Sequence, residues 1–407
     1  MYGCRESRFF KGRCYTSAVR RGFVVPLNFA LACLSCTKPA PPPVTTGRDA
    51  GALSSATKAA PVSVPVPAPQ PVPAPATAPP EAPAPLSPHF VAALTRAKFT
   101  GFIATSKANE HAFASVPGPT FTNASLVPVA SFTKFWTAVA VLRFVERNEL
   151  SLDDTIRTTL PAFASTAWAS STVRELLTHT SRVPEFDEGK GFFTDRTVDF
   201  RDPTRALGMG IDAHGTERRG VFKYKNSEYA LLGAILEARS RLGAGEVLAR
   251  EVFGPAHMLH AGIVIGPAGA PRGLDLTSLG RARAQNFFTA GAGYASADDL
   301  LAFFDALAGK TLLSEASKAM LFDGQKSRSF AAMGCWAYAL ANGDAGALRV
   351  VERQGAIGAM KLFSAFYPDS GRAVVAWTRD SVDFGRPYLG PGAGVGFGLE
   401  LTRLLAE

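Results

Sequence analysis

The chain has 407 residues, enough for one large domain or two small ones, and 47% of them are hydrophobic, which excludes a chain that is disordered throughout. The formal net charge is +9, but a net of +6 falls in residues 1–87, so the rest of the chain is only mildly basic. Because no run of Lys and Arg is interleaved with aromatic residues, we expect no nucleic-acid partner.

The cysteines are distributed unevenly along the chain. Four of the five precede residue 37, and Cys335 is the one in the body of the chain. A single thiol forms no internal disulfide, and no group of Cys and His residues has the spacing of a zinc site. We therefore expect no metal and no other cofactor.

Residues 1–36 are predicted to be an export signal. Arg20 and Arg21 form a basic start, and the apolar stretch that follows is too short to cross a bilayer. Small residues precede Cys33 and Cys36, as in the lipid-attachment site of bacterial lipoproteins, and the arginine pair is also similar to a twin-arginine signal. The prediction is an exported protein of the periplasm or cell envelope, held at the membrane by a lipid anchor on Cys36 or Cys33. The alternative is an apolar patch in a disordered tail.

Residues 37–87 are predicted to be a disordered tether. The stretch from Pro39 to Pro88 holds 16 of the chain's 29 prolines, mixed with Ala, Val, Ser and Thr. Such a composition buries no core and favours the extended polyproline conformation. A tether of this kind would let a folded domain stand away from a membrane.

The body of the chain, residues 88–407, is predicted to be one domain of mixed helices and strands. A mostly helical middle, about residues 150–310, separates two regions that contain strands. The elements expected outside that middle are a helix at Phe90–Ala97, strands at Phe99–Ser106 and Glu110–Val116, a long helix after Ser131, strands at Cys335–Leu340, Met360–Tyr367 and Arg372–Thr378, and a helix at Leu399–Leu405. This order predicts an α/β (α+β) fold, with an antiparallel sheet built from both ends of the domain, flanked by helices and interrupted by a helical insertion.

Ser131 and Lys134 are the first candidates for chemistry. They open a helix that is apolar on nearly all sides, which predicts a buried helix. Ser131 would then lie where backbone N–H groups are unpaired and the helix dipole favours negative charge. Lys134 follows one turn later on the same face, and burial would lower its pKa so that it could act as a base. The alternative is a serine that caps the helix and a lysine on the surface.

Further motifs follow Ser131 in a fixed order. They are Ala-Ser-Phe-Thr-Lys-Phe-Trp-Thr-Ala at 130–138, Asn-Glu-Leu-Ser-Leu-Asp-Asp at 148–154, Val-Arg-Glu-Leu-Leu-Thr-His-Thr-Ser at 173–181, Tyr-Lys-Asn-Ser-Glu-Tyr-Ala-Leu-Leu-Gly at 224–233 and Gly-Ala-Gly-Tyr-Ala-Ser-Ala-Asp-Asp-Leu at 291–300. This set resembles class C β-lactamases and related enzymes of the serine β-lactamase and penicillin-binding-protein superfamily over roughly residues 90–405. The resemblance implies a β-lactamase/transpeptidase-like fold.

The resemblance also implies roles for single residues. Ser131 would be the nucleophile, with Lys134 and Tyr224 moving protons, and Asn226 would bind a substrate amide carbonyl. A phenol beside an ammonium can share or lose its proton near neutral pH, which suits Tyr224 to that task. His179, in the Thr-His-Thr-Ser motif, is interpreted as structural. Without the other motifs, Tyr224 would be read as a loop aromatic that packs on the core.

Arg353 is a departure from the family pattern. Relatives carry Lys-x-Gly or His-x-Gly on a sheet strand, and the matching positions here are Arg353, Gln354 and Gly355, followed by Ala356. A guanidinium stays charged and can bind a carboxylate at two points, but it cannot shuttle protons. The resemblance implies a substrate-binding role for these residues, with an oxyanion hole formed by the backbone N–H groups of Ser131 and Ala356.

The leading interpretation is a serine hydrolase of the β-lactamase or D-Ala-peptidase type, which acts through an acyl-enzyme on an amide, a β-lactam or an ester. A carboxylesterase on the same fold is an alternative. A different alternative is a non-hydrolytic protein that binds or senses cell-wall fragments or β-lactams, which the Arg353 departure favours. The expected partner is a small-molecule or peptidoglycan-derived substrate, and the oligomeric state stays open. An acidic cluster that begins at Glu185 is interpreted as a solvated loop.

Overall fold

The computed structural model describes residues 84–107, 109–118, 120–186, 211–264, 270–274, 276, 284–341, 346–380, 382–385 and 396–406. These residues belong to one compact unit, Thr77–Glu407. The predicted export signal, with Cys33 and Cys36, lies outside the described residues, as does nearly all of the predicted tether. In the described part of the chain, no helix is both long and apolar enough to cross a membrane.

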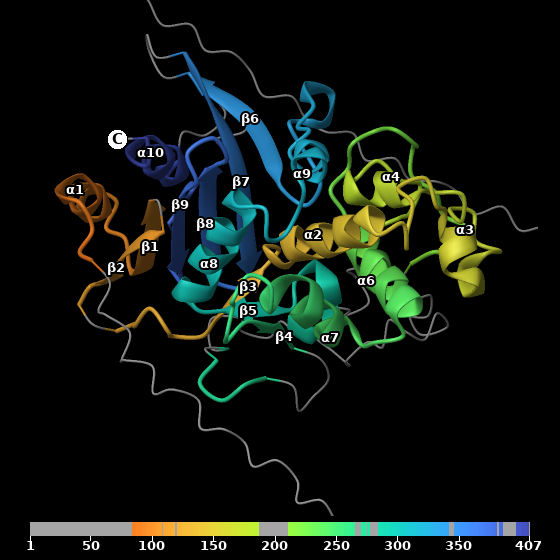
Figure 1. Cartoon of the computed structure of the whole chain (residues 1–407), viewed down its shortest axis with the longest axis horizontal. Helices are drawn as coiled ribbons and strands as arrows, with labels where there is room; N and C mark the ends of the chain where they lie inside the picture. Colours follow the sequence, from red (N-terminus) through yellow and green to blue (C-terminus); the bar gives the residue numbers. More distant parts are fainter. Residues whose placement is uncertain are drawn as a thin grey trace, which may run out of the picture. The chain divides into compact units, whose positions relative to one another are not determined.

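The described chain contains an antiparallel six-stranded sheet built from both of its ends, as the sequence predicts (Figure 1). The strand order is β2-β1-β9-β8-β7-β6, so the N-terminal hairpin joins the sheet through β9. In that pairing Phe102 lies opposite Trp377. The strands are β1 (Gly101–Lys107), β2 (Glu110–Val116), β6 (Trp336–Ala341), β7 (Ala347–Ile357), β8 (Met360–Tyr367) and β9 (Arg372–Thr378).

Helices cover both faces of this sheet. On one face, α1 (Pro88–Arg96) and α10 (Phe397–Leu404) pack together, and Ile103 of β1 points into their core. On the other face lie α2 (Thr133–Glu146) and α8 (Ala297–Ala308), over a core that receives the neighbouring side chain Phe102. Neighbouring residues of β1 thus enter opposite cores, as the two-residue period of a strand requires.

The α2 helix is buried on nearly all sides, as its sequence predicts. Eleven of its fourteen residues are buried, which leaves no polar face for solvent. Aromatic rings fix its start, because Phe132 and Phe135 both pack edge-on against Phe303 of α8. The helix and the aromatic rings packed against it therefore hold the residues at its N-terminus in fixed positions.

The middle of the chain is mostly helical, but two strands within it and one strand just before it are not predicted by the sequence. A second sheet, in the order β3-β5-β4, is formed by β3 (Val127–Ala130), β4 (Gly262–Ile263) and β5 (Gly293–Ala295). The helical elements there are α3 (Ile156–Thr159), η1 (Pro161–Phe163), α4 (Val173–Leu177), α6 (Asn226–Ser240), α7 (Ala244–Leu248), η3 (Ala249–Phe253) and η5 (Ala284–Ala290). After α8 come α9 (Glu315–Leu321) and η6 (Lys326–Arg328). The second sheet matters because β3 leads directly into Ser131.

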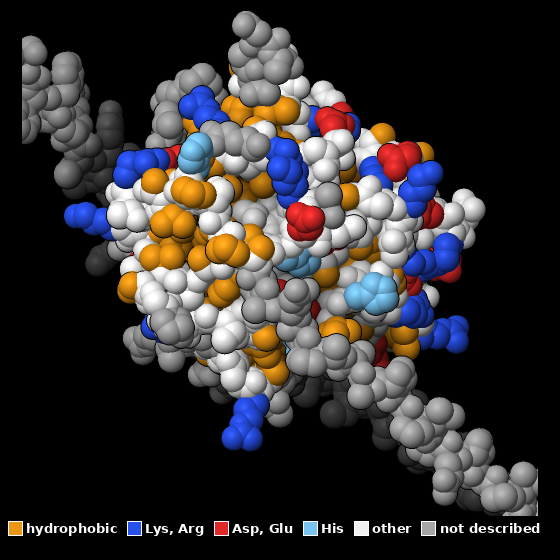
Figure 2. All heavy atoms as spheres, turned by 60° about the vertical axis from the view of Figure 1, so that its left-hand side comes forward, with side chains coloured by type: hydrophobic (Ala, Val, Ile, Leu, Met, Phe, Trp, Pro, Cys, Tyr) orange, Lys and Arg blue, Asp and Glu red, His pale blue; other side chains and the backbone are white. Residues whose placement is uncertain are grey.

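The face shown in Figure 2 carries hydrophobic and charged side chains side by side. Lys and Arg side chains stand at several separate places on this face and are not gathered in one continuous patch. Among the described residues, the large hydrophobic side chains that are exposed are Val91, Val221, Leu259 and Leu276, which lie far apart in the sequence.

Candidate active site

Ser131 lies at the junction of β3 and α2, two residues before the helix begins. The residue before it, Ala130, has a φ of +47°, a left-handed conformation that costs a residue with a Cβ on the order of 1 kcal/mol. The hydroxyl of Thr133 steadies this turn by donating to the Ala130 carbonyl at 2.7 Å. The strained turn fixes the direction in which the Ser131 side chain leaves the strand.

Lys134 is completely buried and its ammonium contacts Ser131, as the sequence predicts. Its Nζ donates to Ser131 Oγ at 3.2 Å, to Asn226 Oδ1 at 2.7 Å and to the Ala290 carbonyl at 2.7 Å. Burial lowers the pKa of Lys134, and the positive charge of Arg353 lowers it further. A lysine in this state can give up a proton more readily than one on the surface.

Tyr224 lies on the other side of Ser131. Its hydroxyl donates to Ser131 Oγ at 2.9 Å and accepts from Arg353 Nη2 at 2.8 Å. Burial alone would raise the pKa of Tyr224, but the charges of Arg353 and Lys134 outweigh it and lower the pKa to about 8. A phenol with that pKa is partly ionised near neutral pH, so it can take a proton from Ser131.

Arg353 lies on β7 and is almost fully buried. Its Nε donates to the Ser131 carbonyl at 2.7 Å, while Nη2 reaches the Tyr224 hydroxyl. The guanidinium also lies 5.0 Å from the Trp336 ring centroid, a distance suited to cation–π attraction. The structure thus places the guanidinium against Ser131 and Tyr224, whereas the sequence leaves open that it binds a substrate carboxylate.

Gly355 and Ala356 follow Arg353 along β7, beside β3, the strand that leads into Ser131. A Cβ on Gly355 would lie 2.2 Å from the Val129 carbonyl oxygen, so β7 and β3 approach each other more closely than a side chain allows. Ala356 is exposed. These positions are compatible with the predicted oxyanion hole, which stays a prediction.

Glu185 is a functional neighbour that sequence reasoning misses. Its carboxylate accepts the backbone N–H groups of Asn226 and Ser227, the first two residues of α6. Burial raises its pKa. The prediction of a solvated loop is therefore wrong for Glu185, which caps α6 and so fixes Asn226 beside Lys134. No local signal marks this contact, because its partners lie more than 40 residues away.

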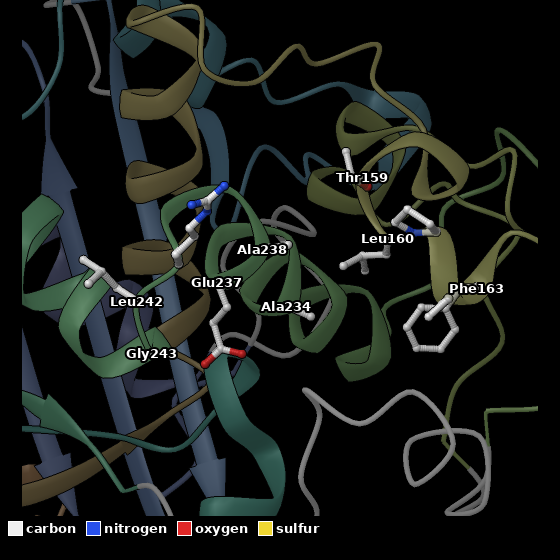
Figure 3. A pocket seen from close by; sticks show the side chains of 11 residues that line it. Thr159, Leu160, Phe163, Ala234, Glu237, Ala238, Leu242 and Gly243 are labelled. Atoms are coloured by element: carbon white, nitrogen blue, oxygen red, sulfur yellow. The ribbon is translucent and has the colours of Figure 1, made fainter. Parts of the chain in front are cut away.

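A separate pocket of about 440 Å³ lies at the far end of α6 (Figure 3). Its lining is mostly apolar and includes Leu160, Phe163 and Ala234, together with the carboxylate-bearing Glu237. Because Asn226 begins α6, whereas Ala234 and Glu237 of the pocket lie in its second half, the pocket is not part of the cluster around Ser131. Within the described ranges, no group of three or more His, Cys, Asp or Glu residues is placed to hold a metal.

Comparison with known proteins shows which family this chain matches. The profile of the family described as Beta-lactamase matches residues 102–389. The protein PbpX of Bacillus subtilis (strain 168) is 33% identical over 135 residues, which are 33% of this chain and 32% of PbpX. The matched segment thus spans about a third of the length of that curated relative.

Two solved structures show the same fold. A penicillin binding protein from Bacillus halodurans has a TM-score of 0.60 and 23% identity, covering 73% of this chain and 96% of that chain. The D-amino acid amidase from Ochrobactrum anthropi SV3 has a TM-score of 0.61 and 17% identity, covering 75% of this chain and 94% of that one. Both confirm the predicted β-lactamase/transpeptidase-like architecture.

Proposed function

Because the chain belongs to the β-lactamase family, we propose that it is a serine hydrolase that cleaves an amide, β-lactam or ester through an acyl-enzyme on Ser131. The observation that carries this proposal is the contact of Ser131 Oγ with two proton carriers, Tyr224 Oη at 2.9 Å and Lys134 Nζ at 3.2 Å. A nucleophile within hydrogen-bond reach of a base whose pKa is suited to neutral pH is the arrangement that acyl transfer needs.

The acylation step follows from these contacts. The ionised Tyr224 phenolate takes the Ser131 proton as Ser131 Oγ forms a bond to the substrate carbonyl carbon. The tetrahedral intermediate then expels its nitrogen or oxygen leaving group, which takes a proton from Tyr224. Lys134 and Arg353 stabilise the phenolate throughout, because both cations lower the pKa of Tyr224.

Deacylation reverses the roles. Water attacks the ester carbonyl of the acyl-enzyme, the phenolate of Tyr224 accepts a water proton, and Ser131 Oγ leaves and regains a proton. Charge that develops on the carbonyl oxygen would be met by the backbone N–H groups of Ser131 and Ala356. Asn226, which Glu185 and Lys134 hold in place, is available for the amide carbonyl of the substrate.

For the substrate, we propose an acyl donor of D-amino-acid type, such as a D-amino acid amide or a cell-wall peptide, with β-lactams as reactive analogues. The support is the similarity of the fold to a D-amino acid amidase and to a penicillin binding protein. A carboxylesterase on the same residues would differ in favouring neutral esters. Parallel turnover of a D-alanine p-nitroanilide, a chromogenic β-lactam and a p-nitrophenyl ester separates these substrates.

Export to the periplasm or cell envelope and a lipid anchor on Cys36 or Cys33 also belong to the proposal. Their support is the sequence alone: the basic pair at Arg20 and Arg21, the apolar stretch after it and the proline-rich residues 37–87. In the cell envelope, the enzyme would meet peptidoglycan-derived substrates.

The nucleophile is tested by covalent labelling. We expect a fluorophosphonate or penicillin probe to modify the wild-type protein at Ser131, and we expect Ser131→Ala to lose the label while keeping its fold, since Ala fills the site without new bulk. Intact-mass analysis measures the label. Ser165→Ala, which changes an exposed serine, is the matched control and should label as wild type does. Full labelling of Ser131→Ala would contradict the mechanism.

A further inference from the structure

The sequence interprets His179 as structural. Its contacts with Tyr224 are more specific than those of a side chain that only fills space. We propose that His179, held by Glu228, is the positioning residue that keeps Tyr224 on Ser131. This inference rests on the proposed function, because it assigns a task that matters only if Tyr224 moves protons.

Backbone contacts of His179 lie on both sides of Tyr224. The N–H of Lys223, the residue before Tyr224, donates to the His179 carbonyl at 2.9 Å. The N–H of Lys225, the residue after it, donates to His179 Nδ1 at 3.3 Å. His179 is therefore bonded to the chain immediately before and immediately after Tyr224, and a shift of its ring or backbone moves that segment.

The ring of His179 also packs against the ring of Tyr224. Their centroids are 4.6 Å apart, and on another side His179 lies 5.1 Å from the ring of Tyr229. The backbone of His179 is left-handed, with a φ of +57°, a conformation that a residue with a side chain adopts at a cost. That cost is evidence that the surrounding structure enforces this orientation of His179.

Glu228 fixes the His179 ring from within α6. Its Oε2 lies 2.6 Å from His179 Nδ1, and both side chains are buried. Among the described residues, Nε2 of His179 has no hydrogen-bond partner, so Nδ1 is the polar atom that holds the ring. The hold from Glu228 therefore determines where the ring lies against Tyr224.

Lys225 and Ser181 complete the network around Glu228. Oε1 of Glu228 accepts from Ser181 Oγ at 2.5 Å and lies 3.1 Å from Lys225 Nζ. Lys225 Nζ also donates to the carbonyls of Ser181 at 3.0 Å and Val183 at 2.8 Å. These bonds join the segment after α4 to the first turn of α6, so Tyr224 is held between two fixed pieces of chain.

The test is the pH profile of Ser131 acylation in Glu228→Ala. If Tyr224 moves away from Arg353 and Lys134, its pKa rises from about 8 toward the ordinary value near 10. We therefore expect labelling at pH 7 to slow by about 10- to 100-fold, as a displacement near 1 Å can do, and the rise of the rate to occur at higher pH.

The direction of the pKa shift distinguishes a displaced Tyr224 from a changed charge near Tyr224. The ionisable groups that face Tyr224 are Lys134 on α2, Arg353 on β7, His179 after α4 and Tyr229 on α6. Glu228→Ala changes none of them. Burial raises the pKa of Glu228 to about 8, and where Glu228 is ionised, loss of its negative charge would by itself lower the pKa of Tyr224, which is the opposite of the expected shift.

Three companion variants complete the test. Glu228→Gln keeps the size of the side chain and can still bond to His179 Nδ1 and Ser181, so it should recover most of the labelling rate. His179→Asn suits the left-handed backbone and loses the ring; it should show the same upward shift as Glu228→Ala and serves if that variant does not fold. Glu251→Ala is the matched control, because Glu251 is a buried carboxylate bonded to Arg143, Arg147 and Arg250 away from Ser131. It should lower stability and leave the profile where it is.

The outcomes distinguish the two proposals. An upward shift in Glu228→Ala or His179→Asn, recovered by Glu228→Gln, supports the positioning role. A profile that keeps its wild-type midpoint in both variants, whatever the stability loss, overturns it and leaves the hydrolase proposal standing. A wild-type protein that no probe labels at Ser131 overturns the hydrolase proposal, and the inference with it.

Discussion

Arg353 lies between Ser131 and Tyr224 and is bonded to both. The sequence leaves open that this guanidinium binds a substrate carboxylate, but in the structure its Nε donates to the Ser131 carbonyl and its Nη2 donates to the Tyr224 hydroxyl. Burial raises the pKa of Tyr224, and the charge of Arg353 is the largest single cause that lowers it. An arginine that cannot shuttle protons can still hold a phenolate, because its charge is permanent.

We expect Arg353→Ala to shift the pH dependence of acylation upward. Tyr224 acts as a base only when ionised, so the rate should rise with pH through about 8 in the wild type and at higher pH in the variant. The loss should therefore be greatest at low pH and shrink above pH 9. Arg353→Lys keeps the charge but not the two-point contact, and should recover the rate in part. The measurement is kcat/KM between pH 5.5 and 10.

The substrate dependence of Arg353→Ala decides whether Arg353 stabilises the Tyr224 phenolate or binds a substrate carboxylate. A phenolate-stabilising role predicts equal losses on a carboxylate-bearing substrate and on a neutral ester at one pH. A carboxylate-binding role predicts a loss of about one to two decades that is confined to the carboxylate-bearing substrate.

For single residues, the sequence predicts contacts between residues that are close along the chain and misses contacts between residues that are far apart along it. Ser131 lies just before α2 and Lys134 in its first turn, only three residues apart, so spacing and apolar surroundings predict that their side chains meet. Tyr224 and Asn226 were reached only through the family resemblance. Glu228 meets His179 across 49 residues, and nothing near either residue indicates the other.

Among the elements, β7 is a strand that the residue pattern does not indicate, although the family resemblance places Arg353 on a strand. A strand next to a core is expected to alternate apolar and polar residues. In β7 two charged residues, Glu352 and Arg353, are both buried, and Glu352 bonds to Tyr338 of β6 at 2.8 Å. Paired buried charges break the pattern that predicts a strand, whereas the neighbouring β8 and β9 are apolar and were placed well. The strands of the second sheet are too short to give a pattern.

We expect Gly355→Ala to separate β7 from β3. The added Cβ would meet the backbone carbonyl of Val129, which cannot turn away as a flexible side chain can. The free energy of unfolding should fall by about 1–3 kcal/mol, and labelling of Ser131 should slow because β3 leads into it. Denaturant unfolding and probe labelling measure the two effects. Gly309→Ala, where an added Cβ makes only ordinary contacts, is the control and should change little. If Gly355→Ala kept wild-type stability, the packing of β7 against β3 would not require a glycine at this position.

At the scale of the whole molecule, the proposed export and lipid anchor are supported by the sequence alone. We expect a fatty-acid probe fed to cells to label the full-length protein, and either Cys36→Ser or Cys33→Ser to abolish the label, because only one of the two thiols can be the attachment site. Gel fluorescence after membrane fractionation measures it. Cys335→Ser alters the buried thiol of the body and should keep the label. A mature chain that retains its N-terminus and carries no lipid would exclude the anchor.

The strand order also sets when the sheet can form. β1 and β2 are made early, but β1 needs β9 as its second neighbour, since Phe102 pairs with Trp377. Pairings so distant along the chain are slow to form, because a long loop must close first. Until β9 is synthesised, one edge of the N-terminal hairpin stays open to pairing with other chains. A protein with this topology is therefore expected to complete its main sheet only after its last strands have emerged, so the N-terminal hairpin waits for the C-terminal strands.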